Sequence, residues 1–448
     1  MKGTVALITL GCDKNLVDSE YLLGAIMEKG YLITSDVRKA DIIIINTCGF
    51  IRSAKQESIN TILEMARLKQ KGNCKLLIAT GCLVQRYRDV LLKEIPELDA
   101  VIGTGDFLKF PDLIEQIKGS KLSITENQNV INYDIKKRIN TFKYISYVKI
   151  AEGCNNCCSY CAIPQIKGSY RSRTIESIKE EVELLVSNGI REINIVAQDT
   201  TSYGIDLFGK PSLPELLKAL VDIKGEFWIR ILYAYPTNID DKLLEVISSS
   251  PKIVKYLDIP LQHISDRILK LMNRPMNSEQ IKKLIEKIRN RVPDIAIRTT
   301  FIVGFPTESE EDFRKLIDFV KEYRFDRVGA FKYSQEEGTY AASLKPQVPE
   351  KIKQKRFDQL MRIQQLISKK NNEKMLGTTI TVLTESYDPK SKLFIGRSQK
   401  DAPEVDGIVL FKGEKCELGQ FYKVKITKAF EYDLFGEVVV PLEKKAFP

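Results

Sequence analysis

Several common sequence features are missing from this chain, and each absence excludes a class of protein. The 448 residues contain no run of eighteen or more apolar residues, which excludes a membrane-spanning helix. The opening stretch MKGTVALITLGCDKN has no small-residue cleavage site after a longer apolar run, so it reads as a first strand and not as a signal peptide. No short-period repeat or long low-complexity tract is present. We therefore expect a cytoplasmic protein of two or three globular domains.

Histidine is nearly absent, because His263 is the only one in the chain. A lone histidine invites a general-base role. Its context, Ile259-Pro-Leu-Gln-His263, is the end of an expected strand, and we expect the side chain to be structural.

The charge balance is moderately basic, with 69 Lys and Arg against 59 Asp and Glu and a net charge of +10. This permits contact with RNA or with a partner on RNA, and it fits a Lys-rich solvated surface equally well. Nine cysteines are present. In a reducing cytoplasm they are better explained as ligands or free thiols than as disulfides.

The fold class expected from the hydropathy pattern is α/β, in three parts. Residues 1–118 alternate continuous apolar runs with amphipathic helices, which predicts a doubly wound domain with a buried parallel sheet. Residues 119–140 are polar and predict a linker with room for a β-excursion. Residues 141–375 contain six further strand–helix units, which favour a partial (βα) barrel over a flat sheet. Residues 376–446 show short strands with turns, as in a small OB-like β-barrel.

Three cysteines of the first region share one context. Cys12, Cys48 and Cys82, here called the N-terminal triad, each follow the carboxyl end of an expected strand. In an open parallel sheet the loops at that edge converge, and ligands bind there. Three thiolates suit a zinc ion completed by water. They suit a [4Fe–4S] cluster with one iron free of protein ligands equally well.

The stretch Glu152-Gly-Cys-Asn-Asn-Cys-Cys-Ser-Tyr-Cys161 places four cysteines close together after the first strand of the barrel. Two CxxC steps suggest zinc, but zinc knuckles normally have a spacer of about a dozen residues or more, and these two steps abut. Parsed as CxxxCxxC, the stretch offers three thiolates to one face of a cluster and leaves the fourth iron open. These are Cys154, Cys158 and Cys161, here called the loop triad. Cys157 is then a bystander able to substitute for Cys158.

The CxxxCxxC stretch resembles the radical S-adenosylmethionine (SAM) superfamily, and its flanking residues narrow the resemblance to the methylthiotransferases. That family also has an N-terminal three-cysteine domain and a C-terminal TRAM domain, so the resemblance covers nearly the whole chain. It is closest to the branch that modifies ribosomal protein uS12. Its tRNA-modifying relatives typically carry a Gly-Cys-Gln-Met-Asn type at the first cysteine. Four stretches carry the closer match: Leu10-Gly-Cys-Asp-Lys-Asn-Leu-Val-Asp-Ser-Glu20, Ile163-Pro164 with Gly168 and Ser172-Arg173, Ala197-Gln-Asp-Thr-Thr-Ser-Tyr-Gly204, and Asp401-Ala-Pro-Glu-Val-Asp-Gly407.

The resemblance implies a function. Each triad would hold a [4Fe–4S] cluster, and the open iron at the loop triad would chelate SAM. In this family SAM is cleaved to a 5′-deoxyadenosyl radical, which abstracts hydrogen from an unactivated carbon. No side-chain acid or base does this at neutral pH, so no catalytic triad is expected. The implied activity is methylthiolation of an aspartate β-carbon in uS12, with a second SAM as methyl donor.

Four further residues are expected near SAM. Gln198 and Asp199 end the second barrel strand, in the region that resembles the family's contact with the SAM amino group, although capping of the following turn explains them equally well. Gly304 lies in a loop that resembles a SAM-edge loop of the superfamily, or in an ordinary strand–turn–helix junction. Arg173 is expected to pair with a carboxylate of SAM or of the substrate, or to lie on the surface.

The alternative substrate within the family is tRNA. From residue 376 onward the chain has eleven Lys and Arg and eleven Asp and Glu. An RNA-binding barrel is expected to be basic, so this neutral domain, with Asp401, Glu404 and Asp406 together, favours a basic ribosomal protein. The basic helical stretch after Pro349 is expected to be solvated, or to touch ribosomal RNA.

The expected partners are uS12, free or on the small subunit, an electron donor such as flavodoxin or ferredoxin, and a source of sulfur. Nucleic-acid contact is secondary in this interpretation. A non-catalytic Fe–S or zinc module that binds nucleic acid is the alternative from a different class.

Overall fold

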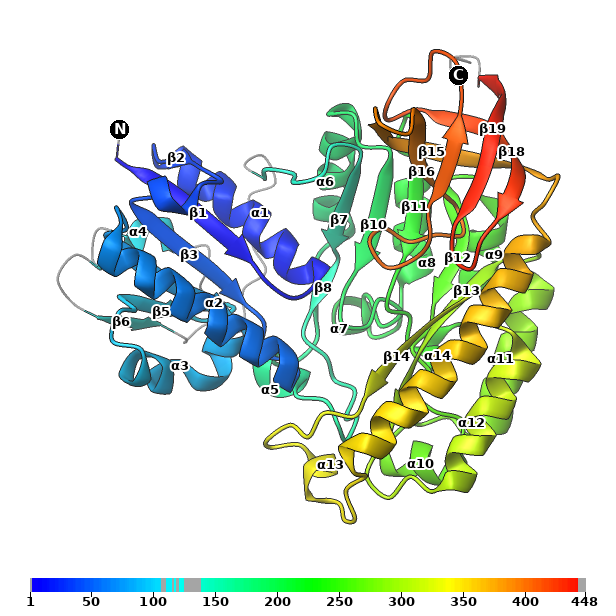
Figure 1. Ribbon diagram of the computed structural model, residues 1–448, viewed down its shortest axis with the longest axis horizontal. Coiled ribbons are helices and arrows are strands. Elements are labelled where there is room, and N and C mark those ends of the chain that lie inside the picture. Colours follow the sequence, from blue (N-terminus) through cyan, green and yellow to red (C-terminus); the bar gives the residue numbers. More distant parts are fainter. Residues whose placement is uncertain (1, 106–109, 115–116, 118–120, 125–137, 442–448) are drawn as a thin grey trace.

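The computed structural model describes residues 2–105, 110–114, 117, 121–124 and 138–441. Figure 1 shows an N-terminal α/β unit, a larger unit of parallel strands and helices, and a small β-barrel near the C-terminus. Most of the predicted linker, 119–140, lies outside the described residues. No helix in the described ranges is long and apolar enough to cross a bilayer.

The described N-terminal unit contains a parallel sheet with the strand order β2-β1-β3-β4-β5-β6. The sequence predicted β1, β3 and β4, allowed for a β-excursion where β6 lies, and missed β2 and β5. Because β6 pairs with β5, the sheet continues into the segment predicted as linker. The strands are β1 (Thr4–Thr9), β2 (Leu32–Ile33), β3 (Ile42–Thr47), β4 (Leu76–Gly81), β5 (Ala100–Ile102) and β6 (Leu122–Ile124).

Helices cover both faces of this sheet, as predicted for a doubly wound domain. On one face α1 (Asp13–Glu28) packs against the strands, and the same apolar cluster continues into the first strand of the second unit. On the other face lie α2 (Arg52–Lys71) and α3 (Cys82–Glu94). The alternate residues of each buried strand therefore face two different helical layers.

The second unit is an open parallel sheet in which neighbouring strands follow chain order. This confirms the partial (βα) barrel. Its strands are β7 (Ile145–Lys149), β10 (Glu192–Val196), β11 (Trp228–Ile231), β12 (Ile253–Asp258), β13 (Ala296–Val303) and β14 (Arg327–Lys332). The helices on its outer face are α6 (Ile175–Ser187), α8 (Leu213–Val221), α9 (Asp241–Ser249), α11 (Ser278–Arg291), α12 (Glu310–Tyr323) and α14 (Glu350–Glu373).

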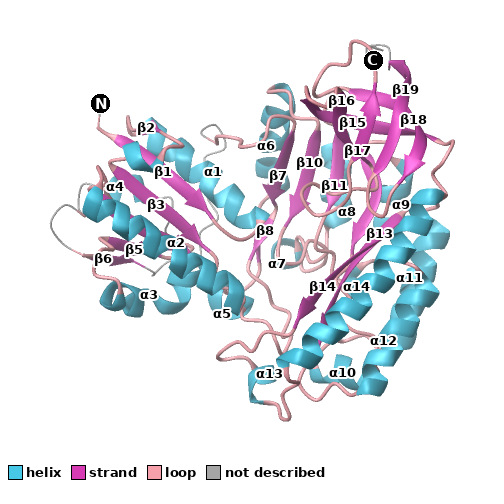
Figure 2. Cartoon of the chain, in the orientation of Figure 1, coloured by secondary structure: helices cyan, strands magenta, loops and turns pink. Residues whose placement is uncertain are grey.

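Shorter elements complete these two units, as Figure 2 shows among the loops. They are η1 (Val37–Lys39), α4 (Phe110–Leu113), β8 (Ala151–Glu152), α5 (Ile163–Lys167), β9 (Arg171–Ser172), α7 (Ile205–Phe208), η4 (Pro236–Asn238), α10 (Asp266–Leu271) and α13 (Tyr340–Ser343).

The C-terminal unit is a closed five-stranded barrel with the order β15-β16-β17-β19-β18. It covers part of the inner face of the open sheet, where the rings of Trp228 and Phe421 lie 4.7 Å apart. Leu383 and Ala402 join the same apolar cluster. The strands are β15 (Thr379–Asp388), β16 (Leu393–Ser398), β17 (Val409–Lys412), β18 (Phe421–Ala429) and β19 (Leu434–Pro441).

The acidic segment of this barrel does not form the partner-facing surface suggested by the sequence. Asp401 is buried and forms an ion pair with Arg327 of the open sheet. The Asp406 side chain is 1% exposed, and its carboxylate lies 2.9 Å from Arg298. Only Glu404 of the three is exposed. That interpretation is wrong for Asp401 and Asp406, because each carboxylate neutralises a cation of the neighbouring unit.

The basic stretch after Pro349 forms α14, which packs against β14 and α12. Arg356 of this helix is buried, and its Nη1 lies 2.8 Å from Glu308 Oε1. Gln364 donates a hydrogen bond to the Phe325 carbonyl at 3.1 Å. At least one side of the helix is therefore used for packing within the chain.

Candidate active site

The N-terminal triad lies at one edge of the first sheet. Cys12 follows β1, Cys48 follows β3 and Cys82 follows β4, and these strands are neighbours. The strand order changes direction between β1 and β3, which is the place where doubly wound folds bind their ligands. Burial raises the pKa of the Cys82 thiol to about 12, and both Cys12 and Cys48 lie close enough to act on it electrostatically. The structure thus brings the three predicted residues together.

Two glycines allow these loops to approach one another. Gly11 has a φ of +92°, and a Cβ added there would lie 2.7 Å from Cys48 Cβ. Gly81 has a φ of +95°, and its Cβ would lie 2.5 Å from the Thr47 carbonyl oxygen. Only glycine combines this backbone conformation with such close contacts. The Gly-Cys pairs at positions 11–12 and 81–82 therefore serve the geometry of the triad.

Two of the three thiols lie at helix N-termini. Cys12 is the N-cap of α1, and Cys82 is the first residue of α3. The sequence placed both helices too late, starting at Asp18 and Arg86, and so missed this feature. A helix N-terminus favours the thiolate form that binds metal, against the effect of burial. Cys12 is exposed while Cys48 and Cys82 are buried, so the triad is accessible from the side of Cys12.

The loop triad lies between β8 and α5. The Cys154 N–H donates to the Gly168 carbonyl at 3.1 Å, and the Cys161 N–H donates to the Cys158 carbonyl at 3.1 Å. Burial raises the pKa of Cys161 to about 12, and Cys158 and Cys154 raise it further. Cys157 is exposed, and its thiol lies 3.6 Å from the Asn155 carbonyl. The loop therefore places Cys157 apart from the other three.

The sulfurs of the loop triad have hydrogen-bond donors. The Ile163 N–H points at Cys161 Sγ at 3.5 Å, and Arg274 Nη1 lies 3.6 Å from Cys158 Sγ. The Tyr235 hydroxyl lies 4.0 Å from Cys158 Sγ, and the Arg274 guanidinium stacks over the Tyr235 ring at 4.2 Å. Donors of this kind stabilise thiolates and raise the reduction potential of Fe–S clusters.

The two triads adjoin each other. Cys82 of the N-terminal unit packs in one buried cluster with Ala162 and Ile166. Ala162 directly follows Cys161, and Ile166 belongs to α5, which lies between the two units in Figure 1. The short segment after the loop triad is therefore also the surface against which Cys82 of the N-terminal triad packs.

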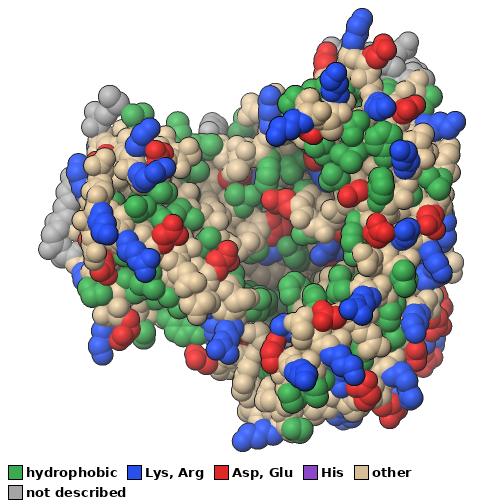
Figure 3. Space-filling view, in the orientation of Figure 1, with side chains coloured by type: hydrophobic (Ala, Val, Ile, Leu, Met, Phe, Trp, Pro, Cys, Tyr) green, Lys and Arg blue, Asp and Glu red, His purple; other side chains and the backbone are tan. Residues whose placement is uncertain are grey.

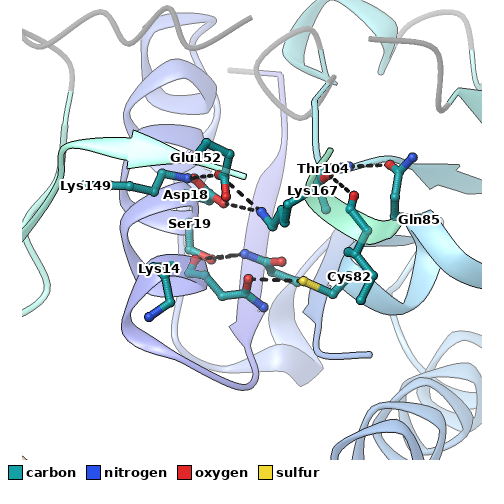
Figure 4. Close-up of polar contacts among 12 residues, drawn as sticks. Lys14, Asp18, Ser19, Cys82, Gln85, Thr104, Lys149, Glu152 and Lys167 are labelled. Carbon is teal, nitrogen blue, oxygen red and sulfur yellow. Dashed lines mark hydrogen bonds and ion pairs between the residues drawn. The ribbon is translucent and has the colours of Figure 1, made fainter. Parts of the chain in front are cut away.

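A buried ionic cluster joins the units beside the triads, and Figure 4 shows it. Asp18 of α1 contacts Lys149 of β7, which also contacts Glu152. Lys167 of α5 lies 3.5 Å from Asp18 and 3.3 Å from Glu152. Because two cations face two carboxylates, the buried charges compensate one another. We call these four residues the ionic cluster. Sequence reasoning missed it, since its members come from four separate elements.

Gln198 and Asp199 are both held against the loop that carries the loop triad. Gln198 Nε2 donates to Glu152 Oε1 at 2.6 Å, and its own Oε1 is buried with no partner among the described residues. Asp199 accepts from Asn156 Nδ2 at 2.9 Å and from the Ser202 hydroxyl at 2.7 Å. Asp199 thus anchors the loop as well as the turn after β10.

Arg173 and Gly304 occupy different surroundings. Arg173 is 4% exposed, forms an ion pair with Glu181 of α6 and donates to the Lys149 carbonyl at 3.0 Å. These contacts give it a packing role within the barrel. Gly304 directly follows β13 at the carboxyl edge with a φ of +70°, and the Lys353 side chain packs against it.

Three family models match successive parts of the chain. The radical SAM superfamily matches residues 148–320, and the TRAM domain matches residues 376–439. Residues 4–103 match a family described as uncharacterized protein family UPF0004. Each range lies within one of the three units of the structure, and the radical SAM match ends before β14 and α14 of the second unit.

Curated relatives match the chain along nearly its whole length. A protein of Geobacter sulfurreducens is 48% identical over 442 residues, 98% of this chain and 99% of its own, and is named ribosomal protein uS12 methylthiotransferase RimO. A protein of Caldicellulosiruptor saccharolyticus with the same name is 52% identical over 440 residues, 97% of this chain and 99% of its own. The chain belongs to the RimO family of methylthiotransferases.

Solved structures resemble this RimO family member in fold. The radical SAM methyltransferase TsrM from Kitasatospora setae, with cobalamin and a [4Fe–4S] cluster, is 14% identical with a TM-score of 0.57, covering 76% of this chain and 74% of its own. The cobalamin-dependent radical SAM enzyme OxsB is 13% identical with a TM-score of 0.52, covering 82% and 56%.

Membership of the radical SAM superfamily implies a [4Fe–4S] cluster and SAM. The residues of the loop triad fit such a cluster, because one loop supplies three thiolate ligands and two of their sulfurs, those of Cys161 and Cys158, have N–H donors aimed at them. In the described part of the chain, no three His, Cys, Asp or Glu side chains converge tightly enough for a single metal ion. A cluster needs no such convergence, because each thiolate binds a different iron.

The only histidine of this RimO family member lies at the rim of the barrel. His263 follows β12 and is fully buried. Its Nδ1 accepts a hydrogen bond from the Ser265 N–H at 3.0 Å, and its Nε2 lies 3.8 Å from Glu308 Oε2. Burial lowers the pKa of His263 to about 3, so the ring is neutral at physiological pH. These contacts agree with the structural role expected from its context.

Proposed function

We propose that this RimO family member methylthiolates the β-carbon of an aspartate in small-subunit ribosomal protein uS12. The observation that carries the proposal is the adjacency of the triads, because Cys82 packs against Ala162, the neighbour of Cys161. Carbon activation at one site and sulfur delivery at another serve a single substrate atom only when the two sites adjoin.

We further propose that each triad holds one [4Fe–4S] cluster. Each offers three thiolates, which leaves one iron open. When bound, the clusters and SAM supply the radical, the sulfur and the methyl group. The chain itself positions the loop triad through Asp199, which holds Asn156, and through the hydrogen bonds from Arg274 and Ile163.

Gln198, Asp199 and Gly304 are the proposed SAM contacts. Glu152 fixes the amide of Gln198, so that the unpartnered Oε1 is free to accept a hydrogen bond from the SAM amino group. Gly304 lies at the same carboxyl edge, where barrel enzymes keep their ligands. Arg173 is left out of this set because it is buried against Glu181.

The substrate uS12 is proposed to be used free or on the small subunit in the cytoplasm. The chemistry also requires an electron donor such as flavodoxin or ferredoxin, and a source of sulfur. The relatives that are named for uS12 favour a protein substrate over tRNA, and they cover this chain almost completely.

The test is a mass assay on both candidate substrates. The protein is purified, reconstituted anaerobically with iron and sulfide, and supplied with SAM, a reductant and either uS12 or tRNA. We expect about eight irons per chain, four for each cluster, and a mass gain on uS12 equal to a methylthio group in place of hydrogen. Modification of tRNA alone would refute the proposal. Stoichiometric zinc without SAM cleavage would support the non-catalytic module instead.

A further inference from the structure

A lysine of the N-terminal unit reaches across to the mouth of the barrel. Lys14 lies in the first turn of α1, two positions after Cys12. Its ammonium lies 3.3 Å from the centroid of the Tyr233 ring. Tyr233 follows the end of β11 at the carboxyl edge of the barrel, where barrel enzymes bind their substrates. The ammonium is thus placed between the N-terminal triad and the barrel mouth.

The ammonium of Lys14 is buried and has few acceptors. The residue is 8% exposed. Among the described residues its only hydrogen-bond acceptor is Asp13 Oδ1 at 3.0 Å, while the Tyr233 ring covers another side. An ammonium has three donors, and a buried donor without an acceptor is unfavourable. The Lys14 ammonium can therefore donate a further hydrogen bond to an anionic oxygen.

The residues around Lys14 hold it in this place. Tyr233 has a φ of +60°, an unfavourable conformation for a bulky residue. Its hydroxyl donates to Asp13 Oδ1 at 3.1 Å, and its N–H donates to Asp258 Oδ2 at 3.1 Å. Figure 3 shows that the surface is hollowed between the two large units, with acidic and basic side chains both visible in the hollow. These contacts hold the Lys14 ammonium where it can form a charge-assisted hydrogen bond with an incoming carboxylate.

We propose that Lys14 binds the side-chain carboxylate of the substrate aspartate and so selects an aspartate for reaction. This inference rests on the proposed function, in which the reacting carbon is the β-carbon beside that carboxylate. When the substrate carboxylate binds Lys14, the β-carbon next to it would lie between Cys12 and the mouth of the barrel. Asp13 competes for the same ammonium in the free protein and is displaced, wholly or in part, when substrate enters.

The test is a binding cycle that needs no turnover. Reconstituted protein is titrated, without reductant, with purified uS12 and with uS12 in which the modified aspartate is replaced by asparagine. We expect the wild-type enzyme to bind the aspartate form about 10- to 100-fold more tightly, the range for a hydrogen bond between charged groups. Lys14→Met should lower the affinity for the aspartate form by the same factor and leave the affinity for the asparagine form unchanged. Lys14→Arg, which keeps the charge, should retain part of the preference.

Lys55→Met is the matched control. Lys55 also joins the two units, with one carboxylate partner, Glu336 at 2.8 Å, and a tyrosine ring, Tyr87, near its ammonium. It should keep the full preference for aspartate. The inference is overturned if Lys14→Met keeps that preference, or if its only defect is in SAM binding to the reconstituted protein. Failure of the proposed function gives a different result, because wild-type enzyme would then leave uS12 unmodified.

Discussion

The two triads each bring three thiols together, but they draw them from differently arranged parts of the chain. The loop triad comes from eight consecutive positions between β8 and α5, whereas the N-terminal triad comes from three strand ends spread over residues 12 to 82. The first needs one loop conformation, and the second needs a whole parallel sheet. A metal site built from one loop is therefore separable from the rest of its domain, and one built across a sheet is not.

The two sites also differ in how their sulfurs are stabilised. The loop triad has side-chain and backbone donors, including Arg274 at 3.6 Å from Cys158 Sγ. The N-terminal triad uses the N-termini of α1 and α3, with Lys167 lowering the pKa of Cys82 against the effect of burial. The loop triad therefore depends mainly on individual donors close to its sulfurs, whereas the N-terminal triad depends mainly on the placement of two helices, aided by Lys167.

The largest expected effect separates the triads directly. Cys161→Ala should remove about half of the iron and lower SAM cleavage by more than about 100-fold, beyond the loss seen for outer-shell partners of metal sites. Cys48→Ala should also remove about half of the iron, but it should leave SAM cleavage intact and abolish methylthiolation. Iron analysis and detection of 5′-deoxyadenosine measure the two effects.

Cys157→Ala is the control for both variants and should keep all of the iron and both activities. If Cys48→Ala abolishes SAM cleavage as well, the two sites are not separable in the way their construction indicates.

The next effect tests whether the ionic cluster serves both sites. Lys167→Met should destabilise the protein by about 3 kcal/mol, since a buried carboxylate pair is left with one cation fewer. Lys55→Met, which removes a partly exposed ion pair, should cost about 1 kcal/mol or less. Thermal unfolding and the iron content of both triads measure the difference. Equal costs for the two variants would show that the ionic cluster is no more than an ordinary interdomain contact.

A smaller effect concerns the loss of stability at low pH, which we attribute in part to His263 in the barrel unit. The folded His263 stays neutral down to a pH of about 3, because burial lowers its pKa, while the unfolded histidine takes up a proton below about 6.5. Stability from this group is thus complete above pH 6.5 and is lost as the pH falls, by about 1.4 kcal/mol per pH unit. His263→Asn should remove that part of the slope between pH 4 and 6 in unfolding measurements. An unchanged slope would assign the acid sensitivity to other groups.

The smallest effect concerns the potential of one cluster. Arg274→Met removes a cationic donor from Cys158 Sγ and should lower the potential of the cluster at the loop triad by on the order of 50 mV, equivalent to about one kcal/mol for one electron. The cluster at the N-terminal triad should keep its potential. Redox titration followed by electron paramagnetic resonance of Cys48→Ala and Cys161→Ala backgrounds separates the two signals, and equal shifts in both would contradict the assignment.

Much of the fold followed from periodicity. The predicted strands 41–46 and 75–79 and the helix 278–291 match β3, β4 and α11 closely, because continuous apolar runs and a regular helical stripe have few alternatives. The starts of α1 and α3 were placed too late for different reasons. Asp13, Lys14 and Asn15 are polar and hide the first turn of α1, whereas Leu83 and Val84 continue the apolar run of β4 and hide the first turn of α3. The short strands β2 and β5 gave no pattern long enough to recognise.

Some residues of the candidate site were also predictable from the sequence, and others were not. Cysteine spacing and strand ends selected the six residues of the two triads, since ligand type and position along the chain are local properties. The ionic cluster was not predictable, because Asp18, Lys149 and Lys167 read separately as ordinary charged residues. Asp401 and Asp406 were misjudged as a surface for the same reason, since their partners lie in another unit.

Residue types and their spacing along the chain set the chemistry that this protein can support: which thiols are available, in which spacing, and on which class of fold. The folded structure sets how that chemistry is coupled. It placed Cys82 on Ala162, buried Arg173 against Glu181 and brought Lys14 over Tyr233. Each ligand is a property of a single residue, so the sequence shows it directly. Burial and charge compensation arise only when distant segments pack together and exclude water.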